Sequence, residues 1–502
     1  MKSKPDLKFS ELIADYKSYM DNKSDTRLLK KAWDFAKLAH TGQKRLTGVP
    51  YVNHPLETAK ILTSWKLDAA TIAAGLLHDT VEDGGATEED LIKEFGIEIS
   101  QLVAGVTKVS NVKLRGSKDK EFVENLRKMF LAMAKDLRVV LVKLADRMHN
   151  MRTLYAIPKE KQERIARETL EVFAPLAERL GMGEVKAKLD DLAFPYVYQE
   201  KYKLVKKESL IHYKKAEETI KTMKRAILRR AAELEVKVRV NGRKKHLYSL
   251  WLKLERPEIS WDFEKIHDIV ALRVLVDSVA ECYTALGVIH NLYKPVPHLG
   301  VSDFIAQPKP NGYQSIHTKV FGPKGKIVEV QIRTYEMHES AEYGIASHWA
   351  YSQAKSRGIS GELLENRGVA VDSEKLSWVK QLADWQKELA DSEEFLRAVK
   401  FDALSHRNFV FSPLGDVYNL PKGSTPVDFA YAVHTQLGSY IKGVKVDGKV
   451  VPLDFKLRSG QVVEIIKSKS SHPPRSDWLK FVVTTTARKE INKYLRNLRI
   501  KE

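Results

Sequence analysis

The 502-residue chain has almost no cysteine and no long apolar segment. Its single cysteine, Cys282, excludes an internal disulfide framework and a cysteine-rich zinc module. No apolar run approaches the roughly 18 residues that a membrane-spanning helix needs, and residues 1–6 lack the apolar core of a signal peptide. Because 43% of the residues are hydrophobic and 30% are charged, a wholly disordered chain is also excluded. We therefore expect a soluble, cytoplasmic protein with no membrane partner.

Acidic residues are the minority, since 84 Lys and Arg stand against 65 Asp and Glu, giving a net charge of +19. The basic excess is concentrated in two segments. Residues 201–260 contain 18 basic and 7 acidic residues, and residues 456–502 contain 12 basic and 4 acidic residues. The rest of the chain is neutral overall. Each segment is either a solvated helical face or a binding site for a polyanion such as phosphate or RNA, and charge alone leaves both interpretations open.

Hydrophobic spacing changes along the chain and predicts a multidomain α+β fold. Up to about residue 190 apolar residues recur every three or four positions, and a basic helical stretch continues to Arg230. Residues 236–240 alternate like a strand, with a turn expected at Asn241–Gly242, and residues 269–276 have the pattern of a central strand. A hairpin is expected around residues 322–325.

The later part of the chain predicts a linker and a small module. Residues 352–371 are polar, and residues 376–389 have the spacing of one connecting helix. Short strands between residues 408 and 466 flank a helix expected from about Pro426 to Leu437. We place the domains at residues 1–195 (helical), 196–352 (mixed), 353–405 (linker and helix), 406–468 (strand module) and 469–502 (basic tail).

A first cluster of chemically reactive residues lies in the helical part. His54, the pair His78–Asp79, and Asp146 offer two imidazoles and two carboxylates, a donor set that suits manganese, iron or zinc and a hydrolytic reaction on a phosphate ester. Glu82 and Asp83 follow one helical turn after the pair and could orient water. Isolated histidines are more often satisfied core residues, so spacing alone does not establish the site.

A second cluster lies in the mixed part. Arg243, Lys245 and Lys253 are close-spaced cations that suit a triphosphate or, equally, a solvated helix start. Asp268 opens the central strand, and Glu329 shares one face of its strand with Gln331. Two such carboxylates beside a basic cleft would hold magnesium, although carboxylates at strand ends are often only solubilising. Tyr313, within Pro308–Thr318, could stack on a base or be a turn residue.

The helical part resembles the all-α HD hydrolase domain of the RelA/SpoT family, whose members make and destroy the alarmone (p)ppGpp. The resemblance is carried by residues 40–45, 50–55, 76–83 and 144–153. It implies that a manganese ion (Mn2+) is bound by His54, His78, Asp79 and Asp146. It also implies that Glu82 and Asp83 assist the water and that Arg45 and Asn150 hold the nucleotide. Leu46 departs from the family pattern, where lysine is common. His40 and His149 are expected to pack or to support the ligands.

The mixed part resembles the nucleotidyltransferase-like synthetase domain of the same family, in residues 308–318, 335–339 and 341–349. The resemblance implies transfer of the ATP β,γ-pyrophosphoryl group to the 3′-hydroxyl of GDP or GTP. The phosphates of ATP would be bound by Arg243, Lys245 and Lys253. A magnesium ion (Mg2+) would be bound by Asp268 and Glu329, the latter also helping to deprotonate the hydroxyl. Guanine would stack on Tyr313, and the acceptor would be held by Lys309, Asn311 and His317. Residues 298–303 depart from the family's Arg-Phe-Lys-Asp and keep only the aspartate.

Residues 408–416 and 420–431 resemble a TGS domain, which is a small β-grasp fold. In this family the resemblance implies that His434 contacts the 3′ end of deacylated tRNA, with the basic tail beside it. Long members continue into zinc-finger-like and ACT modules, which we do not find. We therefore expect a bifunctional (p)ppGpp synthetase and hydrolase. A hydrolase with a degenerate synthetase domain and a tRNA-binding regulator remain alternatives. The dominant activity, its switch, the choice of GDP or GTP and the oligomeric state stay open.

Overall fold

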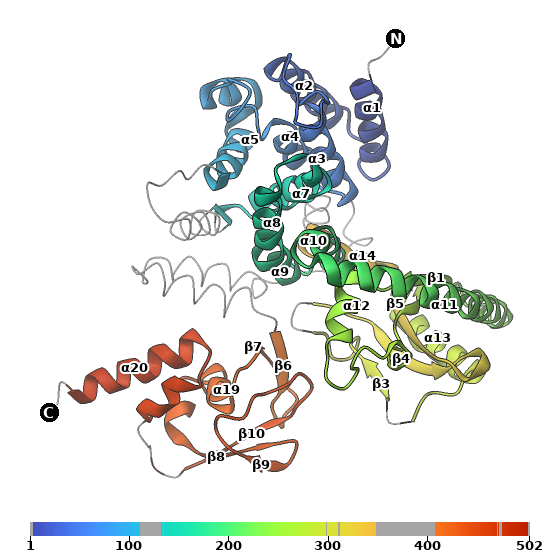
Figure 1. Cartoon of the computed structure of the whole chain (residues 1–502), viewed down its shortest axis with the longest axis vertical. Helices are drawn as coiled ribbons and strands as arrows, with labels where there is room; N and C mark the ends of the chain where they lie inside the picture. Colours follow the sequence, from blue (N-terminus) through green and yellow to red (C-terminus); the bar gives the residue numbers. More distant parts are fainter. Residues whose placement is uncertain are drawn as a thin grey trace. The chain divides into compact units, whose positions relative to one another are not determined.

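The structure is a computed structural model, shown in Figure 1. It describes residues 4–110, 132–133, 135–297, 299–309, 312–347, 407–468, 470 and 474–499. The chain forms two compact units, of which the first contains the helical and mixed parts and the second contains residues 407–499. The predicted linker at residues 352–371 and the predicted helix at residues 376–389 lie outside the described residues.

The N-terminal part is helical throughout its described residues. Its α-helices are α1 (Lys4–Lys17), α2 (Lys23–Ala39), α3 (Asn53–Ser64), α4 (Ala69–Leu77), α5 (Glu88–Ser110), α7 (Arg138–Arg152), α8 (Lys159–Glu168), α9 (Ala174–Arg179) and α10 (Gly183–Val197). A 3-10 turn (Leu154–Ala156) and a π-helical turn (Thr169–Phe173) connect some of them. Almost every residue of α4 is buried, because α4 packs against α2, α3, α5 and α7. The helices that carry the predicted metal ligands therefore adjoin one another.

The mixed part is built on a five-stranded sheet with strand order β1-β2-β5-β4-β3. The strands are β1 (Arg239–Lys244), β2 (Val270–Val276), β3 (Val301–Asp303), β4 (Ile316–Phe321) and β5 (Ile327–Thr334). β2 and β5 are parallel, and the other pairs are antiparallel. The helices are α11 (Gln199–Glu233), α12 (Leu247–Leu254), α13 (Val279–Leu292) and α14 (Tyr335–Tyr343), with 3-10 turns at Phe263–Lys265 and Pro323–Gly325.

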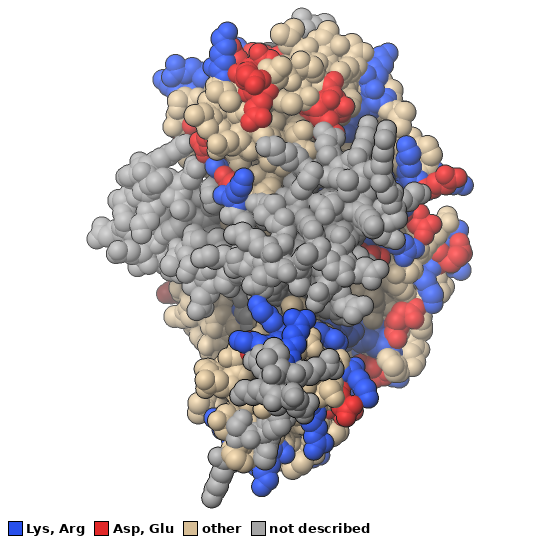
Figure 2. Space-filling view, turned by 90° about the vertical axis from the view of Figure 1, so that its left-hand side faces the viewer, with Lys and Arg blue, Asp and Glu red and all other residues tan. Residues whose placement is uncertain are grey.

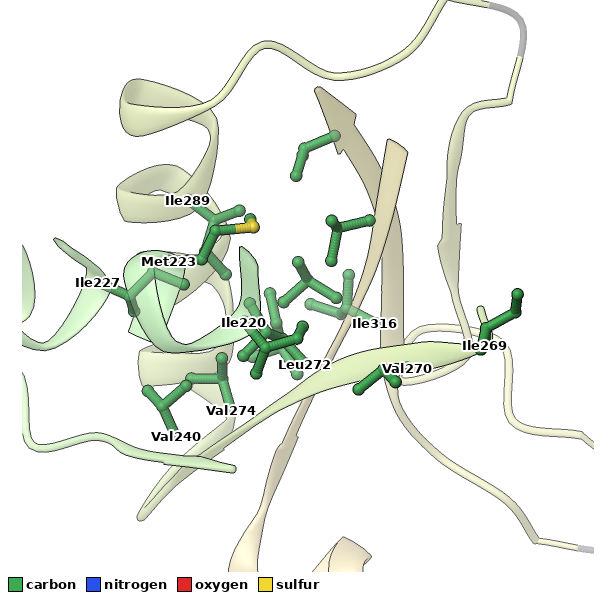
Figure 3. Close-up of a cluster of buried hydrophobic side chains, with 14 of the residues drawn as sticks. Ile220, Met223, Ile227, Val240, Ile269, Val270, Leu272, Val274, Ile289 and Ile316 are labelled. Atoms are coloured by element: carbon green, nitrogen blue, oxygen red, sulfur yellow. The ribbon is translucent and has the colours of Figure 1, made fainter. Parts of the chain in front are cut away.

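One face of this sheet is apolar and forms the core of the mixed part. α11 and α13 pack on the sheet, and Figure 3 shows Ile220 of α11 beside Leu272 of β2, and Met223 of α11 beside Ile289 of α13. Because side chains alternate along a strand, the residues between these apolar positions face the other way. On the second face Arg273, Gln331 and His317 lie side by side across β2, β5 and β4, together with apolar residues such as Leu275.

The expected central strand and hairpin are confirmed by β2 and by β4–β5. The expected turn at Asn241–Gly242 is wrong, because both residues lie inside β1 and pair with Arg273 and Leu272. A Cβ at Gly242 would lie 3.0 Å from Ile220 Cγ2. The glycine therefore allows β1 to lie close to α11. Gly242 in the sequence thus marked a close packing contact and not a turn.

The second unit contains two small sheets. β6 (Arg407–Phe411) pairs with β7 (Val417–Pro421), while β8 (Ile441–Val446), β9 (Lys449–Val451) and β10 (Val463–Lys467) form a sheet of order β10-β8-β9. The helix α19 (Pro426–Val433) ends earlier than expected, and 3-10 turns follow at Leu437–Tyr440 and Ser476–Lys480. The basic α20 (Thr485–Arg499) packs on α19.

A buried carboxylate joins α19 to the segment before α20. One oxygen of Asp428 accepts hydrogen bonds from Val483 N at 2.9 Å and Thr484 N at 2.8 Å, and the other accepts from Thr425 N at 2.8 Å. The basic C-terminal segment is therefore packed onto this unit. In Figure 2 several Lys and Arg side chains (blue) gather in the lower half of the view. None of the described helices is long and apolar enough to span a lipid bilayer.

Candidate catalytic sites

The four predicted metal ligands converge in the helical part. His54 lies on α3, Asp146 lies on α7, and His78–Asp79 directly follows α4. His54 Nε2 is 3.2 Å from Asp146 Oδ1 and 3.4 Å from Asp79 Oδ2, and His78 Nε2 is 3.1 Å from Asp79 Oδ1. One ligand atom from each of His54, His78 and Asp146 lies within 4.8 Å of the others. Segments far apart in sequence thus present nitrogen and oxygen donors to one point.

The hydrogen bonds of the two histidines leave this point suited to a cation. His78 Nδ1 lies 2.9 Å from the carbonyl oxygen of Gly75 and must donate to it, so the lone pair of Nε2 is free. His78 Nε2 is buried and has no hydrogen-bond partner. His54 Nδ1 lies 2.6 Å from His149 Nδ1, which directs the other nitrogen of His54 towards the carboxylates. The donor set therefore fits a divalent metal ion.

Burial and neighbouring charges set the protonation states of this site. Burial would raise the pKa of Asp146, but Lys143, whose Nζ lies 2.8 Å from Asp146 Oδ2, and the two histidines lower it well below its usual range. Burial lowers the pKa of His54 and, to about 3, that of His149. The imidazoles of His54 and His149 are thus neutral and the carboxylate of Asp146 is ionised, and neutral imidazole and ionised carboxylate are the states that metal coordination requires.

The residues beyond the pair His78–Asp79 lie at the open side of the site. α4 ends at Leu77, yet Asp83 N donates to Asp79 O at 2.9 Å, so the expected spacing of one helical turn is kept. The Tyr51 hydroxyl is 3.0 Å from Asp79 Oδ2 and 2.8 Å from Asp83 Oδ2, and its one proton serves either oxygen. Partial burial, followed by the charges of Asp79 and Asp83, raises the pKa of the Glu82 carboxyl. Glu82 is therefore the better proton acceptor of this group.

The predicted nucleotide-binding pair of this site is also brought together. Arg45 Nη2 donates to Asn150 Oδ1 at 3.0 Å, and Arg45 Nη1 donates to Thr153 Oγ1 at 3.3 Å. Asn150 Nδ2 in turn donates to Asp146 Oδ1 at 2.5 Å. The neighbouring Leu46 is 76% exposed and contributes no polar group here. A cation and an amide thus lie beside the metal-ligand cluster.

A second site lies on the polar face of the sheet. His317 pairs with Gln331, and Arg273 pairs with the same glutamine on the other side, so side chains from three strands share this face. A cavity of about 180 Å³ lies here. Polar residues of the sheet and of the segments next to its strands line the cavity: Arg243, Lys245, Asp268 and Gln331.

Two lysines hold the carboxylate of Asp268. Lys245 Nζ and Lys253 Nζ each lie 2.7 Å from Asp268 Oδ2, while Oδ1 is buried without a hydrogen-bond partner. Burial would raise the pKa of Asp268, but the two lysines lower it to about 2. An ionised carboxylate with one free oxygen fits a magnesium ligand, although the lysines now occupy its other oxygen.

Glu329 has a different set of partners. Gln331 Nε2 donates to Glu329 Oε1 at 2.9 Å, and His317 Nδ1 lies 3.3 Å from the same oxygen. Burial would raise the pKa of Glu329, but these two partners lower it to about 2. Tyr313 is joined to the group, because its hydroxyl lies 2.7 Å from His317 Nε2. The structure thus links Tyr313, His317 and Glu329 in one chain of contacts.

The structure describes three of the remaining residues singled out from the sequence, and a fourth lies outside the described residues. Asn311 lies outside the described residues, and Lys309 immediately precedes that gap. Asp303, the aspartate kept in the departing loop, accepts from Ile305 N and Ala306 N at 2.9 Å and shapes the turn after β3. His434 is exposed at the end of α19, where its Nδ1 accepts from Gln436 N at 3.2 Å.

Comparison with known proteins matches three family models. The HD domain matches residues 32–183, the region found in RelA/SpoT proteins matches residues 242–356, and the TGS domain matches residues 408–467. The chain is 47% identical over 474 residues to a GTP pyrophosphokinase of Myxococcus xanthus, covering 94% of this chain and 61% of that protein. The chain therefore carries an HD domain, a region found in RelA/SpoT proteins and a TGS domain.

Other relatives carry both kinds of names. A bifunctional (p)ppGpp synthase/hydrolase of Mycobacterium tuberculosis is 44% identical over 481 residues, covering 96% of this chain and 64% of that protein. A guanosine-3′,5′-bis(diphosphate) 3′-pyrophosphohydrolase of Aquifex aeolicus is 44% identical over 471 residues, covering 93% and 64%. The chain thus spans about three fifths of the length of these RelA/SpoT relatives.

The three matched regions together contain all the predicted site residues. The structure places further residues beside the two sites. Arg273 projects from β2 on the polar face, and its Nη2 lies 3.1 Å from Glu342 Oε1. A lone arginine within the apolar run 269–276 was the signal that could have found it. Tyr51 lay inside a matching sequence block without an assigned role. Lys186 of α10 lines the cavity, although no spacing in its helix pointed there.

Proposed function

We propose that the chain is a bifunctional alarmone enzyme that hydrolyses the 3′-pyrophosphate of (p)ppGpp and makes (p)ppGpp from ATP and GDP or GTP. The observation that carries the proposal is that one chain holds two separate clusters. One cluster brings together His54, His78 and Asp146, with Asp79 beside them, and the other is a cavity whose lining includes the carboxylate of Asp268 and Lys245. The names of the relatives cover the same two activities.

Hydrolysis would take place at the HD site. His54, His78, Asp79 and Asp146 would hold the metal ion, proposed to be manganese, which lowers the pKa of bound water and neutralises phosphate charge. Arg45 and Asn150 would bind the nucleotide beside it. Tyr51 and Asp83 would orient water, and Glu82, with its raised pKa, would accept the proton that water releases. The water oxygen forms a bond to the phosphorus attached to the 3′-oxygen, the bond from that phosphorus to the 3′-oxygen breaks, and pyrophosphate leaves while the 3′-oxygen takes up a proton, which restores GDP or GTP.

Synthesis would take place on the polar face of the sheet. Arg243, Lys245 and Lys253 would bind the triphosphate of ATP, and Asp268 and Glu329 would hold magnesium, which offsets phosphate charge. The 3′-oxygen of the acceptor forms a bond to the β-phosphorus of ATP, the bond from that phosphorus to the α,β-bridging oxygen breaks, and AMP leaves. The pKa of Glu329, near 2, favours cation binding over removal of the hydroxyl proton. The guanine base would stack on Tyr313, with His317, Lys309 and Asn311 around the acceptor.

A two-direction assay on the purified chain tests the proposal. The parent protein should release pyrophosphate from ppGpp with manganese and form ppGpp and AMP from ATP and GDP with magnesium. Asp79→Ala should abolish only the first reaction, and Glu329→Gln should abolish only the second. Hydrolysis at the parent rate by Asp79→Ala would refute the HD assignment.

The same assay decides on a second candidate, a hydrolase whose synthetase domain only binds nucleotide. This candidate is favoured by residues 299–303, which contain no Lys or Arg, and by the local hydrogen bonds of Asp303. In that case Asp79→Ala, which cannot degrade the product, would accumulate no ppGpp from ATP and GDP.

A contact with deacylated tRNA is proposed for the TGS unit. The support is the exposed His434 and the net charge of +8 in residues 456–502. Filter binding of deacylated tRNA over a salt series should show a steep slope in the parent, since each phosphate contact releases counterions. His434→Ala should weaken binding, whereas equal affinity for tRNA lacking its 3′-terminal nucleotides would contradict the contact.

A further inference from the structure

The cavity on the polar face is not built by the synthetase domain alone. Gly183, Lys186 and Ala187 of α10 line the cavity together with Arg243, Lys245 and Asp268. α10 begins where the HD match ends and precedes the RelA/SpoT match by some 45 residues. Its residues 184–197 therefore belong to neither matched region, and no role in the reaction follows from those matches.

Close contacts fix the beginning of α10 against the synthetase domain. Ile345 N donates to Leu180 O at 3.0 Å. Gly344 has φ +55°, and a Cβ there would lie 2.2 Å from Leu180 O, so the approach depends on glycine. A Cβ at Gly183 would lie 3.1 Å from Ala341 O. The backbones thus meet with little space between them, which places the next turn of α10 at the cavity.

An ionic contact fixes the far part of α10. His246 Nδ1 lies 2.8 Å from Asp191 Oδ2, and Asp191 Oδ1 accepts from Tyr248 N, at the start of α12, at 2.9 Å. Glu184 Oε2 lies 3.6 Å from His246 Nε2. α10 is therefore held on both sides of Lys186.

Lys186 is a shielded cation at this cavity. Its side chain is 18% exposed, and Nζ lies 3.0 Å from Asp190 Oδ2, one helical turn on. Burial would lower the pKa of Lys186, but Asp190 and other carboxylates raise it, so the ammonium is retained. One ion pair uses part of the capacity of an ammonium group, which has three N–H donors. Lys186 can therefore contact a second anion.

The charge of the expected ligand calls for such a donor. A triphosphate carries several negative charges, and Lys245 and Lys253 are already engaged with Asp268. Residues 299–303, at the opposite edge of the sheet, supply no cation. Among the described residues that line the cavity, the cations from the sheet side are Arg243, Lys245 and His246. A further cation from α10 would complement the phosphates from the other wall.

We propose that Lys186 binds the β,γ-phosphates of ATP, so that the synthetase site is a composite site completed by α10. The inference rests on the proposed synthetase function and adds a residue from outside the matched synthetase region. It makes the position of α10 a condition for triphosphate binding. A displacement of α10 from α12 and α14 would remove one wall and one cation together.

The test compares nucleotide affinity in matched variants. The α,β-methylene analogue of ATP keeps the β,γ-phosphates but cannot transfer them, and AMP lacks them. Calorimetry with magnesium should show that Lys186→Met binds the analogue about tenfold or more weakly than the parent, the scale of one charge-assisted hydrogen bond. Affinity for AMP should be unchanged. Lys188→Met, on the same helix with a side chain 51% exposed, should behave as the parent.

A second variant separates binding from support of the helix. Asp190→Asn removes the ion-pair partner of Lys186 but not the ammonium. It should bind the analogue at least as tightly as the parent, with ppGpp hydrolysis at the HD site reporting that each variant is folded. Loss of analogue binding in Asp190→Asn, equal loss for AMP in Lys186→Met, or undiminished binding of the analogue by Lys186→Met would overturn the proposal. A parent that binds the analogue but forms no ppGpp would refute the synthetase function while leaving the phosphate contact standing.

Discussion

The two candidate sites differ in how far their proposed metal ligands are already brought together. In the HD site the donors of His54, His78 and Asp146 already converge, and the buried Nε2 of His78 has no partner. In the synthetase site the carboxylate of Asp268 is covered by two lysines. In the first arrangement donors from three segments already meet at one point, although Lys143 pairs with Asp146 there. In the second, two lysines share one oxygen of Asp268 and must leave it to reach phosphate. We therefore expect a metal ion to bind the HD site without nucleotide and to bind the synthetase site together with the nucleotide.

The largest effect is expected from removing a ligand of the prearranged site. Asp79→Ala should lower manganese-dependent hydrolysis of ppGpp about a thousandfold or more, because the metal loses a charged ligand held between two histidines. Synthesis, measured as AMP formation, should stay within about twofold of the parent. A parallel loss of both activities would contradict the separation of the sites.

A smaller loss is expected from one lysine of the synthetase site. Lys245→Met should lower the rate of synthesis about a hundredfold, the scale of one lost donor to developing charge. Its neighbour Lys244 is a matched control, since its side chain is 55% exposed and its Nζ pairs with Glu217 on the surface. If Lys244→Met and Lys245→Met lowered the rate of synthesis equally, the loss would come from the lower net positive charge and not from a contact of Lys245 with the phosphates.

A moderate loss of manganese affinity is expected from removing the side chain that orients His54. His149→Phe keeps the ring but removes the nitrogen beside His54 Nδ1. Manganese affinity should fall about 10- to 100-fold, as for other residues that orient a metal ligand. Activity at saturating manganese should recover in large part. A loss of activity that no manganese concentration restores would show that His149 does more than orient His54.

The smallest effect concerns pH at the contact between α10 and α12. Burial would lower the pKa of His246, but Asp191 and Glu184 raise it to about 9. Because the folded pKa exceeds the usual value near 6.5, this contact stabilises fully below about 6.5 and is lost as pH rises through about 9. Affinity for the ATP analogue should therefore fall severalfold between pH 8 and about 10. His246→Gln should show no such step, and an unchanged step in that variant would assign it to another group.

Much of the fold and of the HD site could be predicted because their signals are local. The strand of residues 269–276 was visible as an apolar run, and the ligands near Asp79 lie in one short block. The strand through Asn241–Gly242 was missed because the glycine is needed there for close packing against Ile220, which is distant in sequence. Lys186 was missed for a similar reason. Its position follows from the contacts of α10 with α12 and α14, and no pattern within the helix records them.

The most direct test of the comparison is a manganese titration of the nucleotide-free protein, read from the electron paramagnetic resonance signal of the free ion. The variant Glu329→Gln, which retains the HD site, should bind one equivalent tightly, and Asp79→Ala, which retains the synthetase site, should bind none until the ATP analogue is added. Tight binding of one equivalent by nucleotide-free Asp79→Ala, or none by Glu329→Gln, would contradict the account.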